Sequence, residues 1–249
     1  EDMREHKKAF TLAEVLITLG IIGFVAAITI PTLIANMNNQ KYRSQFKKTV
    51  STLSQAAKMS QAMYDFDFGG IGEKCSNDGG KDNPENSTSI CALLNGTLTG
   101  ATYFDSVTDL KMRKGDSILS YNANIPYSAQ VWSFKDLSSF HAYTLADGSI
   151  FAFEKGLGRN ACSLEIGGEI KDNGYLANET MSYCIGFIDV NGASGPNKEV
   201  RCSIGDNSLT KNDCIVKSRD VTDIFPVRIH DGSVAPATAA VRFIMNTEK

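Results

Sequence analysis

The sequence has few of the residues and none of the motifs on which enzymes and zinc sites most often depend. Only three histidines occur, and they lie far apart. There is no C-x-x-C pair and no G-x-S-x-G, H-E-x-x-H, G-x-G-x-x-G or Walker loop. We therefore expect no zinc site, no other cofactor and no catalytic residues, and we interpret the protein as non-enzymatic.

An excess of positive charge is also lacking. The formal net charge of the 249 residues is −3, which gives no basic surface of the kind that binds nucleic acid. Charge of either sign is absent from Val15 to Gln40, and most of Val15–Ala35 is apolar. That length reaches the roughly 20 residues that a membrane-spanning helix needs.

The six cysteines all follow this apolar run, and their number is even. Disulfides formed in an oxidising compartment are the better interpretation of such a set. Fifteen connectivities are possible for six cysteines. We expect sequential pairing because each pair closes a short, turn-rich loop, although spacing alone does not decide it: Cys75–Cys91, Cys162–Cys184 and Cys202–Cys214.

The helix that begins in the apolar run is expected to continue beyond it. After Pro31, which should loosen the helix locally, apolar residues recur at helical spacing to about Tyr64, and Gly69-Gly70 ends the pattern. We divide the chain into residues 1–9, a short polar leader; 10–36, a transmembrane helix; 37–68, its amphipathic continuation; and 69–249, a disulfide-bearing, β-rich globular domain.

Strand signals dominate the globular domain, so the fold class is α+β, a long N-terminal helix packed on an antiparallel sheet. Asp147-Gly148 is a strong hairpin signal between two strand candidates. Cys75–Asn95 reads as a loop, Ser106–Lys111 as a short helix, and the segment from Pro236 as a terminal helix with the proline near its start. The strand candidates are Val131–Phe134, His141–Ala146, Ser149–Glu154, Cys184–Val190 and Ile224–Ile229.

The segment KKAFTLAEVLITLGIIGFVAAITIPTLI resembles the N-terminal segment of type IV pilins and type II secretion pseudopilins. In that family a membrane peptidase removes a basic leader after a small residue and methylates the new N-terminus. The resemblance implies cleavage between Ala9 and Phe10, N-methylation of Phe10, and assembly roles for Glu14 and Pro31. Ala9 departs from the glycine that is usual at the cleavage site, but it is also small.

Glu14 is unusual because a carboxylate in lipid is unfavourable by roughly 2.5–3.5 kcal/mol. Three interpretations stay open. The carboxylate could favour the positive end of its own helix, neutralise its own terminal amine, or pair with the Phe10 amine of a neighbouring subunit. A secretory signal peptide is disfavoured because the apolar run is too long and no A-x-A site follows.

One loop offers a metal-binding alternative. Oxygen ligands stand on alternate residues of the segment FIDVNGASGPN, at Asp189 and Asn191, and Asn197 and Glu199 follow further on. The resemblance adds that some relatives in the family bind Ca²⁺ in a distal loop. The segment lacks a full EF-hand pattern, and Asp-x-Asn-Gly is also a common turn, so we favour the turn.

The resemblance implies a structural subunit, a pilin or pseudopilin, of a type IV pilus or type II secretion pseudopilus. Its expected partners are other such subunits, the prepilin peptidase and an inner-membrane assembly platform. We expect it in the cytoplasmic membrane before assembly, with the globular domain outside the cytoplasm, and afterwards in the filament. The alternative is a membrane-anchored extracellular binding or adhesion domain that does not polymerise.

Overall fold

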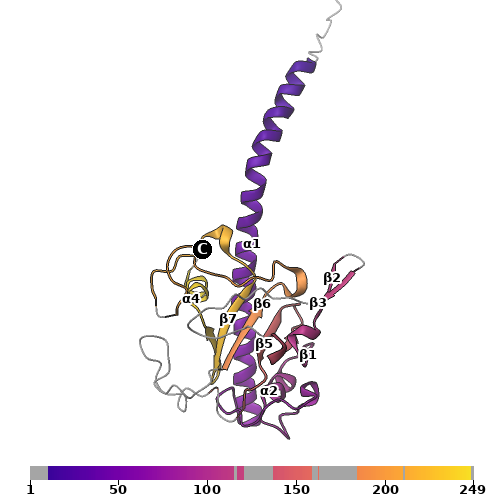
Figure 1. Cartoon of the computed structure of the whole chain (residues 1–249), viewed down its shortest axis with the longest axis vertical. Helices are drawn as coiled ribbons and strands as arrows, with labels where there is room; N and C mark the ends of the chain where they lie inside the picture. Colours follow the sequence, from indigo (N-terminus) through magenta and orange to yellow (C-terminus); the bar gives the residue numbers. More distant parts are fainter. Residues whose placement is uncertain are drawn as a thin grey trace, which may run out of the picture.

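One helix dominates the fold. The computed structural model describes residues 11–114, 117–120, 137–158, 162, 184–209 and 211–247. Helix α1 runs without interruption from Leu12–Tyr64, which corresponds to about 80 Å at 1.5 Å per residue. Its first half extends away from the rest of the chain, and its second half lies along the globular domain (Figure 1).

The globular domain is built on a six-stranded antiparallel sheet in the order β1-β4-β5-β6-β7-β8. The α+β class is therefore confirmed. The strands are β1 (Thr102–Phe104), β4 (Phe140–Thr144), β5 (Ile150–Glu154), β6 (Cys184–Asp189), β7 (Ile224–His230) and β8 (Ser233–Pro236). Strands β2 (Lys111–Lys114) and β3 (Ser117–Ser120) form a separate hairpin. Two short helices complete the domain, α2 (Ile90–Thr97) and α4 (Ala239–Asn246).

The sheet carries apolar residues on both faces, which produces two cores. On β5, Phe151 and Phe153 belong to the larger core with α1, whereas Ile150 and Ala152 belong to a smaller core with Val107. This alternation follows from the period of two along a strand. Because both faces are covered, the residues of β4 and β5 are buried except at their last positions.

Helix α1 supplies one side of the larger core. Its buried side chains recur every three or four residues, as the sequence predicts, and Phe46 stacks on Phe225 of β7 with ring centroids 4.4 Å apart. Tyr64 packs partly buried at the edge of the same core. The buried apolar series is Tyr42, Phe46, Val50, Leu53 and Ala57.

The helix ends where the periodicity predicts. Asp65 adopts the left-handed conformation, with φ 63° and ψ 23°. The next residues leave the helix, and the side chains of Phe66 and Phe68 are buried in the domain. Residues 65–68, at the end of the predicted continuation, therefore form the exit from the helix. A side chain at Gly69 would meet the Oδ1 atom of Asp231 at 2.6 Å, so a residue without Cβ fits this turn.

The predicted hairpin around Asp147-Gly148 is confirmed, because β4 and β5 pair directly through Thr144 and Ile150. The strands expected at 184–190 and 224–229 are confirmed as β6 and β7. The strand expected at Val131–Phe134 lies outside the described residues.

Three expectations were wrong in detail. The helix expected at Ser106–Lys111 is a single 3₁₀ turn, Val107–Asp109, after which Lys111 begins β2. The loop expected at Cys75–Asn95 ends early, because Ser89 caps α2 by accepting a hydrogen bond from the Ala92 N–H. Pro236 does not start the terminal helix: it ends β8, and Thr238 is the N-cap of α4.

Candidate functional site

The candidate site is the exposed N-terminal half of α1, which begins with a capping box. Thr11 is the N-cap, and its Oγ1 accepts a hydrogen bond from the Glu14 N–H at 3.2 Å. The Glu14 Oε2 in turn accepts hydrogen bonds from the Thr11 N–H and the Thr11 hydroxyl, both at 2.8 Å. The carboxylate therefore satisfies donors at the positive end of the helix.

Apolar side chains cover this half of α1 all the way round. None of the most apolar window of the helix is buried, its mean hydropathy is 2.3, and by length and composition the helix could cross a membrane. Leu12 is 80% exposed and Phe24 is 68% exposed. A helix that is apolar on every side is suited to lipid or to the interior of an assembly.

The few polar groups within this segment are satisfied inside the helix. The hydroxyls of Thr18, Thr29 and Thr32 donate to the backbone carbonyls of Val15, Val25 and Thr29 at 2.8–3.0 Å. Such back-bonding leaves no hydroxyl hydrogen to be placed unpaired in a bilayer.

The apolar segment also contains one proline, Pro31, and two glycines, Gly20 and Gly23, which are unusual residues inside a helix. Pro31 lies inside α1, and the helix continues through it. A Cβ atom added to Gly20 or to Gly23 would meet nothing within 4 Å. Each glycine therefore leaves a shallow place on the helix surface where another helix could approach closely.

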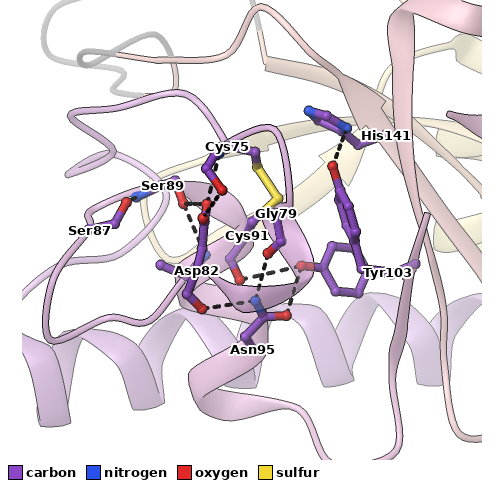
Figure 2. The surroundings of a disulfide bond; sticks show 12 residues. Cys75, Gly79, Asp82, Ser87, Ser89, Cys91, Asn95, Tyr103 and His141 are labelled. Carbon is purple, nitrogen blue, oxygen red and sulfur yellow. Dashed lines mark hydrogen bonds between the residues drawn. A yellow bond between two sulfur atoms is a disulfide. The ribbon is translucent and has the colours of Figure 1, made fainter. Parts of the chain in front are cut away.

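The Cys75–Cys91 disulfide holds the far end of the domain together (Figure 2). Beside it, Asn95 donates from Nδ2 to the carbonyls of Gly79 and Asp82 at 2.8 and 2.9 Å. Its Oδ1 accepts the hydroxyl hydrogen of Tyr143 at 2.9 Å. The side-chain amide of Asn95 therefore uses both its nitrogen and its oxygen in hydrogen bonds that hold the loop in place. These bonds indicate a structural role.

The six cysteines form the sequential pairs that we expect from the sequence, Cys75–Cys91, Cys162–Cys184 and Cys202–Cys214. Among the described residues, one cluster of three side chains has the residue types that can bind a metal ion: Cys75, Asp82 and Cys91. Its two sulfurs are joined to each other, and the Asp82 carboxylate accepts the hydroxyl hydrogens of Ser76 and Ser89. In this oxidised form the group is not arranged to hold a metal.

The loop considered for Ca²⁺ is organised by its own hydrogen bonds. The Oδ1 of Asp189 accepts from the Asn191 N–H at 3.3 Å, and Asn191 Nδ2 donates to the Gly195 carbonyl at 2.9 Å. Asp223, which sequence reasoning missed, accepts the N–H groups of Asn197 and Lys198 at 2.8 and 2.9 Å. This geometry is that of a turn, and Ca²⁺ binding at Asp189 and Asn191 stays a prediction.

Asn191 also connects this loop to α1. The Tyr42 hydroxyl lies 3.5 Å from Asn191 Nδ2, and burial together with Asp223 and Asp189 raises the pKa of Tyr42. Tyr42 therefore remains a neutral phenol, and it connects the loop to the point where α1 enters the domain.

Glu199 is a further buried acid, which the sequence suggested only as a more distant oxygen ligand in the Ca²⁺ alternative. Its side chain is 1% exposed, and its Oε2 lies 3.4 Å from Arg201 Nε. Burial raises the pKa of Glu199 to about 7, although Arg201 and Asn207 oppose the shift. Asn207 also accepts the Ala240 N–H at the start of α4, so Glu199 supports the contact between the Cys202–Cys214 loop and that helix.

The structure places the predicted assembly residues at separate levels of one helix. Glu14 lies in the first turn of α1, and Pro31 lies near the end of the apolar half. Ala9 and Phe10 lie outside the described residues. Sequence reasoning missed the partner of Glu14, although Thr11-x-x-Glu14 is the capping-box pattern and could have identified it.

Comparison with protein families gives one match, the prokaryotic N-terminal methylation motif, over residues 4–30. Searches of curated proteins and of solved structures give no match. The matched residues include Thr11, Glu14 and most of the exposed apolar half of α1. The chain therefore carries the prepilin-type methylation motif that is the hallmark of type IV pilins and pseudopilins, on a helix suited to anchor it in a membrane.

Proposed function

We propose that the protein is a structural, non-enzymatic subunit of a type IV pilus or a type II secretion pseudopilus. The observation that carries this proposal is the methylation motif on a helix whose apolar half is exposed on all sides. Before assembly the lipid bilayer would cover this surface, with the globular domain outside the cytoplasm. In the filament, the same helices of neighbouring subunits would cover it.

Cleavage of the leader would precede assembly into the filament. The prepilin peptidase would cut between Ala9 and Phe10, which removes the polar leader and creates a positive amine one residue before Thr11. That amine would then be methylated by the same enzyme. An inner-membrane assembly platform would lift the processed subunit out of the bilayer, because water would not solvate the apolar helix.

The role of Glu14 follows from the capping box. In the unassembled chain its carboxylate is bound to Thr11, so the charge has partial compensation from its own helix. In the filament we assign it to the Phe10 amine of the next subunit. A carboxylate and an amine in a low-dielectric helix bundle are stable only when they meet, so the pair would select one stagger between neighbouring helices.

The test separates the cap from the charge. Glu14→Gln keeps a hydrogen-bond acceptor that suits a capping box but removes the charge, and Glu14→Val removes both. The measurement is the amount of filament sheared from cells that express the full chain with its assembly proteins, together with leader cleavage followed by mass spectrometry.

We expect both variants to be cleaved and both to fail in assembly. If Glu14→Gln assembles as well as the wild type while Glu14→Val does not, the carboxylate acts only as a helix cap. If both assemble normally, the pairing is wrong. If the wild-type chain is cleaved and stays membrane-bound without forming filaments in the presence of its assembly proteins, the protein is the alternative, an anchored binding or adhesion domain.

A further inference from the structure

The second half of α1 carries charge of one sign on its solvent side. Between Glu14 and Asp65 the helix contains no acidic residue, and it contains five basic residues, all between positions 41 and 58. The solvent side follows a three-and-four spacing of exposed positions: 41, 44, 48, 51, 55, 58 and 62. We call the exposed lysines of this half the basic stripe: Lys41, Lys47, Lys48 and Lys58.

Within the part of the chain that the structure describes, most of the basic stripe has no acidic partner. Lys48 forms an ion pair with Asp147 at 3.3 Å, and its side chain is still 66% exposed. Across the described parts of the chain, no carboxylate lies within 4 Å of Lys41, Lys47 or Lys58. The stripe is therefore a positively charged surface available to another molecule.

The opposite end of the domain is acidic. Residues 65–97, from the end of α1 through α2, hold six acidic and two basic residues, and we call this segment the acidic tip. Figure 1 shows it at the end of the molecule farthest from the protruding half of α1. Asp65, Glu73 and Glu85 are exposed, and among the described residues none of them has a basic side chain within 4 Å.

Lipid headgroups fit the stripe poorly. At about 1.5 Å per residue, Lys48 lies roughly 21 Å and Lys58 roughly 36 Å beyond Ile34, near the end of the apolar half. The polar layer on each side of a bilayer is only about 5–8 Å thick. Only Lys41 lies near it, so most of the stripe needs a different partner.

A second copy of the chain provides one. The distance along α1 from the stripe to Tyr64 is roughly 25–35 Å for Lys47 and Lys41. A copy moved outward along the helix axis by about 30 Å therefore places Lys41, Lys47 and Lys48 of its basic stripe beside the acidic tip of the copy below. We propose that this contact between stripe and tip joins copies of the chain that are displaced by about 30 Å along the filament, an inference that rests on the proposed function.

The geometry of the contact suits a filament. The two surfaces are different, so each copy can use its tip for one neighbour and its stripe for another, and a repeated contact of this kind produces an open helical polymer. Single exposed ion pairs contribute little, but several together fix the relative position of two surfaces and disfavour pairing of like charges. The Glu14–Phe10 contact, between residues about 6 Å apart along the helix, would join a neighbour at a smaller displacement, so the two contacts would fix the positions of two different neighbours.

The experiment exchanges charge between copies. A stripe variant carries Lys41→Glu and Lys47→Glu, and a tip variant carries Glu73→Lys and Glu85→Lys, all in the full chain. The control carries Lys111→Glu and Lys211→Glu, two exposed lysines outside both surfaces, with the same change in net charge as the stripe variant. Filament yield is measured by shearing, and equal levels of processed, disulfide-bonded subunit are verified.

We expect each variant alone to lower filament yield at least tenfold, and co-expression of the two to restore at least half of the wild-type yield. Restoration in mixed cells requires contact between copies. If the stripe variant fails and co-expression does not restore it, the stripe meets something else, such as lipid headgroups, and the proposal is wrong. Normal assembly of either variant alone also overturns it. Absence of wild-type filaments would instead refute the proposed function.

Discussion

Replacing Phe46 with alanine tests the division of α1 into an exposed half and a half that belongs to the globular core. Phe46 is fully buried and stacks on Phe225 with the ring planes 17° apart. A buried Phe→Ala change destabilises a domain by about 3–5 kcal/mol, and the aromatic pair accounts for roughly 0.5–1.5 kcal/mol beyond its buried area. We expect a loss of about 4 kcal/mol, a large part of the 5–15 kcal/mol that stabilises most domains.

The assay is urea unfolding of the full chain in detergent, followed by near-ultraviolet circular dichroism. With a slope of about 2 kcal/mol per M, the midpoint should fall by roughly 2 M. Phe24→Ala is the matched control, because Phe24 is 68% exposed and should leave the midpoint unchanged. An unchanged midpoint for Phe46→Ala, or equal shifts for both variants, would refute the claim that only the second half of α1 is part of the domain core.

Three further predictions follow from single contacts. Glu199 has a pKa of about 7 in the folded protein against about 4.3 unfolded, so the folded state holds its proton more tightly, and its contribution to stability is lost as the pH rises from about 4.5 through 7. Relative to wild type, Glu199→Gln should therefore gain up to about 3 kcal/mol between pH 4.5 and pH 8, measured by denaturant unfolding at each pH; a constant difference would contradict the burial of an acid. Replacing Cys75 and Cys91 together by serine opens a loop with a sequence separation of 16 and should destabilise the domain by about 3 kcal/mol, and an unchanged thermal midpoint under oxidising conditions would show that the bond does not form. Asn95→Asp should lower the free energy of unfolding by about 1–3 kcal/mol, because the two backbone carbonyls that accept hydrogen bonds from Asn95 Nδ2 would lose their donor. The measurement is thermal unfolding of the variant and the wild type at neutral pH, and equal midpoints would contradict a stabilising role for these hydrogen bonds.

The sequence predicted those parts of the fold that depend on local patterns. The three-and-four spacing along 42–64 identified the buried face of α1, and Asp147-Gly148 identified the β4–β5 hairpin, because helix periodicity and turn chemistry are both local. Helix α2 was missed because its eight residues follow a run of turn-forming residues. Its N-cap, Ser89, is of the same polar, turn-forming type as the loop residues before it. Pro236 was misassigned because a proline suits both a helix start and a strand end.

The candidate site was predictable to a similar extent. The methylation motif, Glu14 and Pro31 are visible in the sequence because they lie close together along the chain. Asp223 gains its importance from partners distant in sequence, and Glu199 gains its importance from burial; no local pattern reports either property. The basic stripe lies in one helix, but its meaning depends on the acidic tip, and only the fold shows that this tip lies at the end of the molecule farthest from the protruding half of α1.

The continuity of α1 has a mechanical consequence. A pull on the apolar half passes along the helix backbone directly into the side chains packed against the sheet, Phe46 among them. Because this load acts parallel to the packed surface, the contacts from Tyr42 to Ala57 must slide together and cannot separate one at a time.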